Sequence, residues 1–231
     1  MTRVAVKPDV LRWARQRANL GASDLLSTFP KIEQWESGAL MPTFHQLEKL
    51  AQVTHVPFGY LFLPEPPELQ LPIPDFRTLR NRPFPSFSPE LLDTIYDMQR
   101  RQWWLREERT ETDASPVGFV GTATTSDDPL AIGREMRRAV GLDDGWASHV
   151  RTWESGVGEL RRAIEEVGVV AVINGIVGNN THRKLEIEEF RGFALVDSQA
   201  PVIFVNGADA KSAQMFTLAH EFAHLWLGEA R

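Results

Sequence analysis

The chain has 231 residues, enough for one large or two modest domains, and its 42% hydrophobic and 24% charged residues are ordinary for a globular protein. A formal net charge of −6 gives no overall attraction to nucleic acid or to an anionic membrane, although one domain can still carry local basic charge. The absence of cysteine excludes disulfides and thiolate zinc sites, so a metal ion would need His, Asp or Glu ligands. With neither the apolar core of a signal peptide nor a run of 18 apolar residues, the chain is expected to be cytoplasmic and to make no membrane contact.

The first part of the chain, residues 8–63, predicts an all-α domain of short helices joined by turns. Apolar residues recur at helical spacing, and Gly38 and Pro42-Thr43 mark an end and a start between helices. The expected elements are a helix after Lys7-Pro8-Asp9, helices over 22–29 and 32–37, a helix opening at Pro42-Thr43, and an apolar element over 57–63.

A proline-rich connector is predicted over residues 64–89. Eight prolines occur there, and proline lacks a backbone donor and restricts the residue before it, so a continuous helix or central strand is not expected. The connector is either extended across a surface, burying its apolar residues, or a simple spacer. Its apolar residues include Leu71, Ile73, Phe76 and Phe84.

The remainder, residues 90–231, predicts an α+β domain with a small sheet. One helix is expected from Ser88-Pro89 to about residue 109, and another from Asp128-Pro129 to about Gly141, since both starts combine a capping residue with a first-turn proline. The other expected elements are a helix within 158–168, strands over 169–173, 193–196 and 202–205, and a last helix that is capped by Asp209 or Ser212 and carries 216–227.

The last predicted helix contains a metal-binding pattern, His220-Glu221-x-x-His224. Histidines four apart lie on one helix face, so both imidazoles can ligate one Zn²⁺ ion at about 2.0–2.1 Å. Glu221 flanks that ion as a general base, able to move a proton from an activated water to a leaving amine. The alternative is ordinary hydrogen bonding at the edge of a core, but polar groups among mostly apolar neighbours would then be costly. Those neighbours are Phe216, Leu218, Ala219, Phe222, Ala223, Leu225 and Leu227.

This region resembles the ImmA/IrrE family of metallo-endopeptidases over about residues 128–231. The resemblance is carried by Arg191-Gly192-Phe193, by Val202 to Asn206, by Phe216 to His224, and by the preceding helix and strand over 160–170. It implies a zincin-like α+β domain in a cytoplasmic zinc endopeptidase. It also implies a protein substrate, a helix-turn-helix repressor that is cut or inactivated in stress responses or mobile-element induction.

The sequence departs from that family in its metal ligands. The resemblance implies a third ligand, a glutamate on a later helix, whereas Glu229 is the only acid after Glu221 and follows His220 by nine positions. Nine residues at about 100° each place it on the opposite side of a continuing helix. We therefore expect a truncated or shortened form that binds zinc more weakly than a three-ligand site and has little or no peptidase activity.

Residues 10–63 resemble the XRE (lambda-repressor-like) helix-turn-helix domain. The matching segments are Leu11 to Ala14, Ile32 to Gly38 and Pro42 to Ala51. Compared with that pattern, about four residues are missing around Pro30 at the turn and the start of the recognition helix, and acidic residues outnumber basic ones between 30 and 50. A degenerate domain that binds protein or dimerises is therefore favoured over sequence-specific DNA binding.

Two rival functions are a DNA-binding transcriptional regulator with a non-catalytic, peptidase-like sensor domain, and a non-catalytic scaffold. His182 is predicted in a solvated polar loop, and Arg191 is predicted to pair with Glu186, Glu188 or Glu189 rather than to bind substrate. Trp103, Trp104 and Met98 are predicted to lie in a core or a domain interface.

Overall fold

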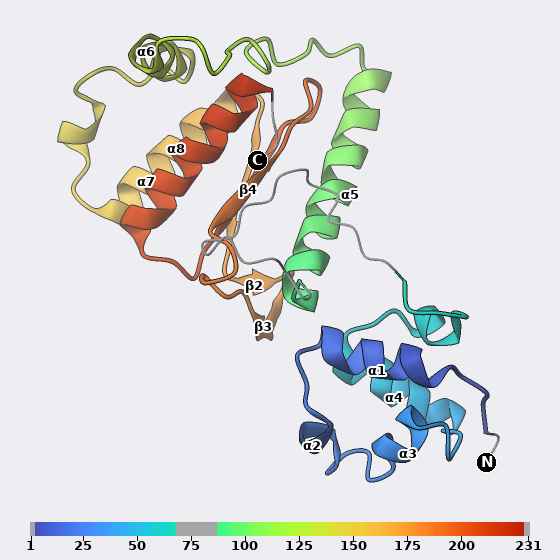
Figure 1. Ribbon diagram of the computed structural model, residues 1–231. Helices are drawn as coiled ribbons and strands as arrows, with labels where there is room; N and C mark the ends of the chain where they lie inside the picture. The colour runs from blue at the N-terminus through green and yellow to red at the C-terminus, as the bar shows by residue number, and fades with distance from the viewer. Residues whose placement is uncertain (1–2, 68–86, 229–231) are drawn as a thin grey trace. The chain divides into compact units, whose positions relative to one another are not determined.

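The computed structural model of the protein describes residues 3–67 and 87–228 (Figure 1). The chain divides into two compact units, which we describe separately: residues 3–67 and 87–92 form the first, and residues 93–228 form the second. Most of the predicted proline-rich connector, with all four of its apolar residues named above, lies outside the described residues.

The N-terminal unit is built of short helices, as predicted. Its helices are α1 (Pro8–Arg17), α2 (Ala22–Leu25), α3 (Ile32–Glu36) and α4 (Phe44–Thr54), followed by the 3₁₀ helix η1 (Phe58–Phe62). The start of α4 is fixed by a reciprocal pair of hydrogen bonds: Thr43 Oγ1 accepts from the Gln46 backbone N–H, and Gln46 Oε1 accepts from the Thr43 N–H.

Helix α2 ends earlier than predicted. The sequence favoured a helix over 22–29, but α2 stops at Leu25 and two turns follow, in which the backbone N–H groups of Thr28 and Phe29 both donate to the Leu25 carbonyl. Ser27 and Thr28 form helices poorly, and Pro30 disfavours helical geometry at Phe29, so local chemistry accounts for the early end.

The core of this unit encloses a buried carboxylate. Leu11, Ile32 and Leu47 are fully buried, and Glu36 is 8% exposed. Arg15 reaches across from α1 and donates to both oxygens of Glu36, from Nε at 2.6 Å and from Nη2 at 2.9 Å. This two-pronged ion pair satisfies the carboxylate and joins α1 to α3.

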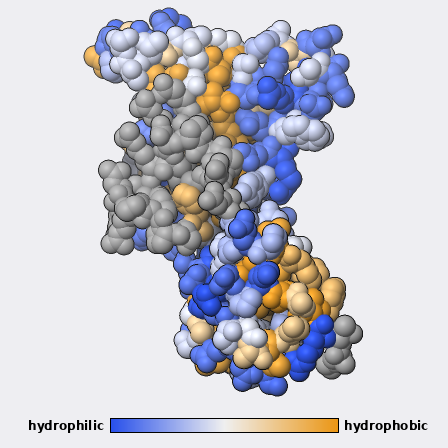
Figure 2. Space-filling model, turned by 45° about the vertical axis from the view of Figure 1, so that its right-hand side comes forward, coloured by the Kyte–Doolittle hydropathy of each residue, from blue (hydrophilic) through white to orange (hydrophobic). Residues whose placement is uncertain are grey.

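Apolar side chains are exposed on the surface of the N-terminal unit (Figure 2). Phe44 and Phe62 are both exposed, and each packs edge-on against Phe58 with ring centroids 5.0 Å apart. Phe44, Phe58 and Phe62 are called the aromatic patch below.

The C-terminal unit contains the longer helices. They are α5 (Pro89–Glu111, of which residues from Asp93 onward belong to this unit), α6 (Pro129–Ala139), η2 (Trp146–His149), α7 (Trp153–Glu166) and α8 (Lys211–Leu227). The predicted starts of α5 and α6 are confirmed, because Ser88 Oγ accepts from the Leu91 N–H and Asp128 Oδ1 accepts from the Leu130 N–H. Helix α7 begins earlier than predicted, since Thr152 and Ser155 form a reciprocal cap that extends it back to Trp153.

The three predicted strands form one mixed sheet in the order β1-β5-β4, with bounds Val170–Asn174, Val202–Asn206 and Gly192–Leu195. Strands β1 and β5 run parallel, with Val170 opposite Val202, and β4 and β5 run antiparallel, with Phe193 opposite Phe204. A separate hairpin of β2 (Ile176–Val177) and β3 (Asn180–Lys184) was not predicted. His182 therefore lies on a strand rather than in the expected loop.

Figure 1 shows α7 and α8 on one side of the sheet and α5 on the other. The main core lies between the helix pair and the sheet, where the Phe119 ring stacks on Trp226 of α8. On the opposite side of the sheet, α5 makes hydrogen bonds to backbone carbonyls. The Gln102 amide donates to the carbonyls of Leu195 and Ala200, and Arg109 donates to those of Gly168 and Gln199. Of the two places predicted for Trp103 and Trp104, the core is wrong, because both are 64% exposed, and the domain interface stays a prediction; Met98 is buried as predicted.

Two glycines bring the ends of β1 and β5 into backbone contact. A Cβ on Gly207 would lie 2.9 Å from the Asn174 carbonyl carbon, and one on Gly175 would lie 2.9 Å from the Ala208 nitrogen. The Gly207 N–H donates to the Asn174 carbonyl at 2.9 Å in the same place. Only residues without a side chain permit this approach, which fixes where the chain leaves β5 toward α8.

Candidate metal site

Helix α8 is positioned at its start by a buried glutamine rather than by the predicted cap. Its N-cap residue is Ala210, so the prediction of Asp209 or Ser212 as the cap is wrong. Gln214 is fully buried, and its amide donates to the carbonyls of Gly207 and Asp209. These bonds hold the first turn of α8 against the loop that leaves β5.

The end of α8 is also held. Gly228 ends the helix in the left-handed conformation, at φ +70°. The N–H groups of Gly121 and Ala123 donate to the carbonyls of Leu225 and Trp226, and the Gly228 N–H also donates to the Leu225 carbonyl. Because both ends are fixed, the side chains between them are presented from a rigid element.

His220 and His224 converge as the helical spacing predicted. Their Nε2 atoms are 3.1 Å apart and their rings are perpendicular. Two nitrogens at about 2.0–2.1 Å from one zinc ion can be separated by at most about 4.2 Å, so the pair fits a shared ion. His220 is exposed and His224 is buried, which places the paired nitrogens at the boundary between solvent and core.

Glu221 faces the sheet, next to Gly192 on β4. It is 5% exposed, and a Cβ on Gly192 would lie 3.3 Å from Glu221 Cγ, 2.5 Å from Thr217 Cγ2 and 2.8 Å from the Phe204 carbonyl oxygen. The missing side chain at Gly192 therefore lets α8 approach the sheet closely at the turn that carries Thr217 and Glu221.

One oxygen of the Glu221 carboxylate is buried without a hydrogen-bond partner. Among the described residues its Oε2 has no hydrogen-bond partner, and burial raises the pKa of Glu221 to about 8. Desolvation is the cause of the shift, because the charged form loses water and gains no counter-charge. Buried polar atoms without a partner are uncommon, and groups with such raised pKa values concentrate at functional sites.

The apolar flanks of the motif are less buried than predicted. Leu218, Phe222 and Leu225 lie in the core, but Ala219 is exposed and Phe216 is 73% exposed. The Phe216 ring stacks beside His220 with centroids 5.9 Å apart and an interplanar angle of 17°. The exposed face of α8 therefore carries an aromatic ring immediately before the first histidine.

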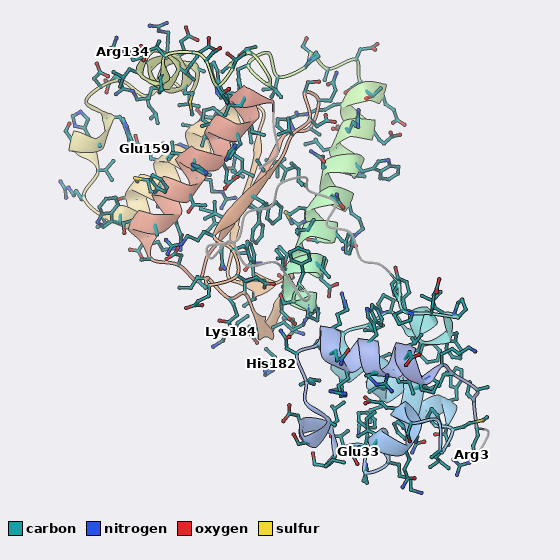
Figure 3. The ribbon with its side chains drawn as sticks, viewed as in Figure 1. Arg3, Glu33, Arg134, Glu159, His182 and Lys184 are labelled. Atoms are coloured by element: carbon teal, nitrogen blue, oxygen red, sulfur yellow. The ribbon has the colours of Figure 1, made fainter. Side chains whose placement is uncertain are left out.

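Neither Arg191 nor His182 forms a hydrogen bond or ion pair with the histidine pair in the described part of the chain. Arg191 pairs with a carboxylate as predicted, but the partner is Asp209, at 3.3 Å between Nη1 and Oδ2, and not the three glutamates named above. His182 is exposed on β3 (Figure 3). No group of three His, Asp or Glu side chains able to hold a metal ion occurs within residues 3–67 and 87–228. Glu229 lies outside the described residues.

A known family model matches part of the C-terminal unit. Residues 165–231, from the end of α7 through all five strands and α8, match the Peptidase_M78 family model, described as the IrrE N-terminal-like domain. This region is similar to an IrrE-type peptidase domain. The match supports the ImmA/IrrE resemblance for the part of the chain that contains the histidine pair. No curated protein and no solved structure matches the chain.

The IrrE-like region also contains contacts that the residue pattern did not reveal. Gly192 was noted only as part of a resembling motif, and the roles of Thr217 and Gln214 were not predicted. A glycine inside a strand does indicate close backbone approach, but the sequence does not say which helix approaches it.

None of the helices in the described part of the chain combines the length and apolar composition needed to cross a bilayer.

Proposed function

We propose that the protein is a zinc-dependent endopeptidase of the ImmA/IrrE type. The observation that carries this proposal is the 3.1 Å approach of the His220 and His224 Nε2 atoms on the helix that also carries Glu221, whose Oε2 is buried and has no partner among the described residues. Two imidazoles and a carboxylate are the donor set that suits zinc and a general base. The family match to residues 165–231 supports the same chemistry.

In this proposal each side chain has a separate task. His220 and His224 hold the metal ion through Nε2. When bound, zinc supplies a Lewis acid that polarises a peptide carbonyl and lowers the pKa of water to about 7. Glu221 would accept a proton at its carboxylate and deliver it to the leaving amine. The close packing of α8 on β4 at Gly192 would keep Glu221 in position during both transfers.

The described residues supply two protein ligands, whereas catalytic zinc sites commonly have three. We therefore expect zinc to be retained weakly and cleavage to be slow, so assays need zinc in excess.

The direct test combines metal binding with cleavage of a proteome-derived peptide library, read by mass spectrometry. Wild-type protein should bind one zinc ion and cleave peptides only when zinc is present. His220→Ala should lose both properties, and Glu221→Gln should keep zinc but lose cleavage. His182→Ala, an exposed histidine outside the site, is the matched control and should behave as wild type. Cleavage that persists in Glu221→Gln, or no zinc-dependent cleavage at all, would refute the peptidase proposal.

For the physiological substrate we propose a helix-turn-helix repressor, as the family resemblance implies. Co-incubation with a panel of lambda-repressor-like proteins and size-matched all-α proteins tests this. We expect the repressors to be cleaved preferentially, in a reaction that depends on zinc and on Glu221. Equal cleavage of both sets of proteins would contradict this proposal.

We further propose that the N-terminal unit binds protein rather than DNA. The aromatic patch supports this, because exposed aromatic clusters are typical of protein interfaces. Arg15, which could otherwise contact phosphate, is committed to Glu36. Repressor binding should weaken when residues 1–63 are removed or Phe44 is replaced by Ala. A mobility shift with duplex DNA that weakens steeply with salt would instead favour the DNA-binding regulator.

A further inference from the structure

Two adjacent tryptophans are exposed on helix α5. Trp103 and Trp104 are each 64% exposed, although tryptophan side chains are highly buried on average in folded proteins. Tryptophan is also among the residue types most enriched in the side chains that carry binding energy at protein interfaces. The exposed pair therefore indicates an interaction surface on α5.

A basic and an acidic residue flank the two tryptophans at helical spacing. Arg100, Trp103, Trp104 and Glu107 occupy positions i, i+3, i+4 and i+7, so they share one face of the helix. All four are exposed, whereas Gln102, which donates to a carbonyl of β4, lies on the opposite side of α5. We call these four exposed residues the tryptophan stripe.

The two charged ends of the tryptophan stripe are accessible to a partner. No ion pair involves Glu107 within the described part of the chain. Arg100 donates from Nη2 to Asp97 Oδ1 at 3.0 Å, but its side chain is 71% exposed, and ion pairs at the surface contribute little to stability. Asp97 also accepts from Arg101 Nε, so Arg100 can turn to another carboxylate without leaving Asp97 unpaired.

The tryptophan stripe is complementary to a second copy of itself. In two α5 helices that pair antiparallel about a two-fold axis between Trp103 and Trp104, residues equally distant from the axis face each other. Arg100 and Glu107 are each three positions from the nearer tryptophan. Arg100 of each copy therefore lies opposite Glu107 of the other, and Trp103 lies opposite Trp104. The two ion pairs would bracket four indole rings.

The size of this contact predicts a weak dimer. An aromatic side chain buries about 150–250 Å² in a core or an interface, so four partly exposed tryptophans would bury several hundred Å². Stable specific interfaces bury about 1,200–2,000 Å² in total. Association should therefore be reversible and should depend on protein concentration in the micromolar range.

We propose that the protein forms a reversible homodimer in which two α5 helices pair antiparallel through the tryptophan stripe. This proposal concerns a surface on α5 and does not depend on the peptidase function proposed above.

The first test is sedimentation velocity of the full-length protein over a concentration series from low micromolar to several hundred micromolar. Wild type should shift from monomer to dimer as the concentration rises. Trp104→Ala should weaken dimerisation by at least about tenfold, because each substitution removes a ring from both sides of the contact. Trp153→Ala, which removes a tryptophan that is 60% exposed on α7, is the matched control and should dimerise as wild type does.

Charge exchange tests the antiparallel arrangement. Arg100→Glu places two acidic side chains opposite each other at both ends of the contact, and Glu107→Arg places two basic ones there. Each variant alone should therefore dimerise about tenfold more weakly than wild type, less so in high salt. When the two variants are mixed, each end again joins an acidic and a basic side chain, so a heterodimer of wild-type affinity should form. Fluorescence-detected sedimentation of one labelled variant with the other unlabelled measures it.

Three outcomes would overturn the proposal. One is a monomer at every concentration, which includes the case in which another part of this chain covers the tryptophans. Another is a dimer whose affinity is the same in wild type and Trp104→Ala. The last is a mixture of Arg100→Glu and Glu107→Arg proteins that associates no more tightly than either variant alone, since this would exclude antiparallel pairing.

Discussion

Two buried glutamates in this protein differ in whether a partner compensates the carboxylate. Glu36 in the N-terminal unit is 8% exposed and receives two short hydrogen bonds from Arg15. Glu221 in the C-terminal unit is 5% exposed, and its Oε2 has no partner among the described residues. The surroundings of Glu36 stabilise the fold, whereas those of Glu221 leave a cost that a bound cation or a reacting proton can relieve. The two glutamates are therefore buried to nearly the same extent but have different roles, which depend on whether a hydrogen-bond partner compensates the carboxylate.

The largest expected effect is on catalysis at Glu221. Glu221→Gln keeps the size of the side chain but removes the proton acceptor, so zinc-dependent kcat should fall about 10²–10⁴-fold while zinc binding remains. Single-turnover cleavage with zinc in excess measures this. A loss of zinc together with activity would show that Glu221 is a ligand rather than a base.

Replacing the paired glutamate should destabilise the N-terminal unit. Glu36→Met leaves Arg15 without its counter-charge in a largely buried position, so the free energy of unfolding should fall by about 3 kcal/mol. Urea unfolding measures the change. Glu33→Met, at an exposed position of the same helix α3 (Figure 3), is the control and should stay within about 0.5 kcal/mol of wild type.

A methyl group at Gly192 should disturb the support of Glu221. Gly192→Ala would place a carbon 2.8 Å from the Phe204 carbonyl oxygen and 2.5 Å from Thr217, and such overpacking costs about 1–3 kcal/mol. We expect lower stability and a fall in kcat larger than any change in KM, because α8 must shift at Glu221. Gly118→Ala, where an added Cβ meets nothing within 4 Å, is the control. Unchanged kcat in a folded Gly192→Ala protein would contradict the positioning role of this glycine.

The smallest expected effect is a gain in stability at Glu221, opposite in sign to the loss expected at Glu36. In metal-free protein, Glu221→Met replaces an unpartnered carboxyl group by an apolar side chain of similar size, so the free energy of unfolding should rise by about 1 kcal/mol. Thermal unfolding in the presence of EDTA measures the change. If Glu221→Met destabilises as much as Glu36→Met, the contrast between the two carboxylates is not energetic.

Elements whose signals are local were predictable from the sequence. The four-residue spacing of His220 and His224 places both rings on one helix face whatever surrounds them, and Asp128-Pro129 starts α6 as predicted. The predicted start of α7 was too late, because Thr152 and Ser155 cap a helix that begins at Trp153, five residues before the predicted region begins at Gly158.

The features that were missed depend on contacts between distant segments or on weak patterns. Gly192 precedes Thr217 by 25 positions, so their contact arises only when α8 packs on β4. Strand β3 is polar along its length and lacks the alternation that marks a half-buried strand, although Gly178-Asn179 is a recognisable hairpin turn. The exposure of Trp103 and Trp104 also could not follow from composition, since it depends on which face of α5 turns toward β4, where Gln102 donates to the Leu195 carbonyl.

The backbone contact between Gly175 and Gly207 makes two positions outside the histidine pair intolerant of change. Each side-chain carbon would meet main-chain atoms at about 2.9 Å, and main-chain atoms cannot rotate away as a flexible side chain can. In a saturation-mutagenesis screen for folded protein, both positions should accept glycine alone, whereas Gly118, Gly133 and Gly158, which face open space, should accept alanine. Such a map of tolerance would locate the junction between the sheet and α8 without any knowledge of the chemistry.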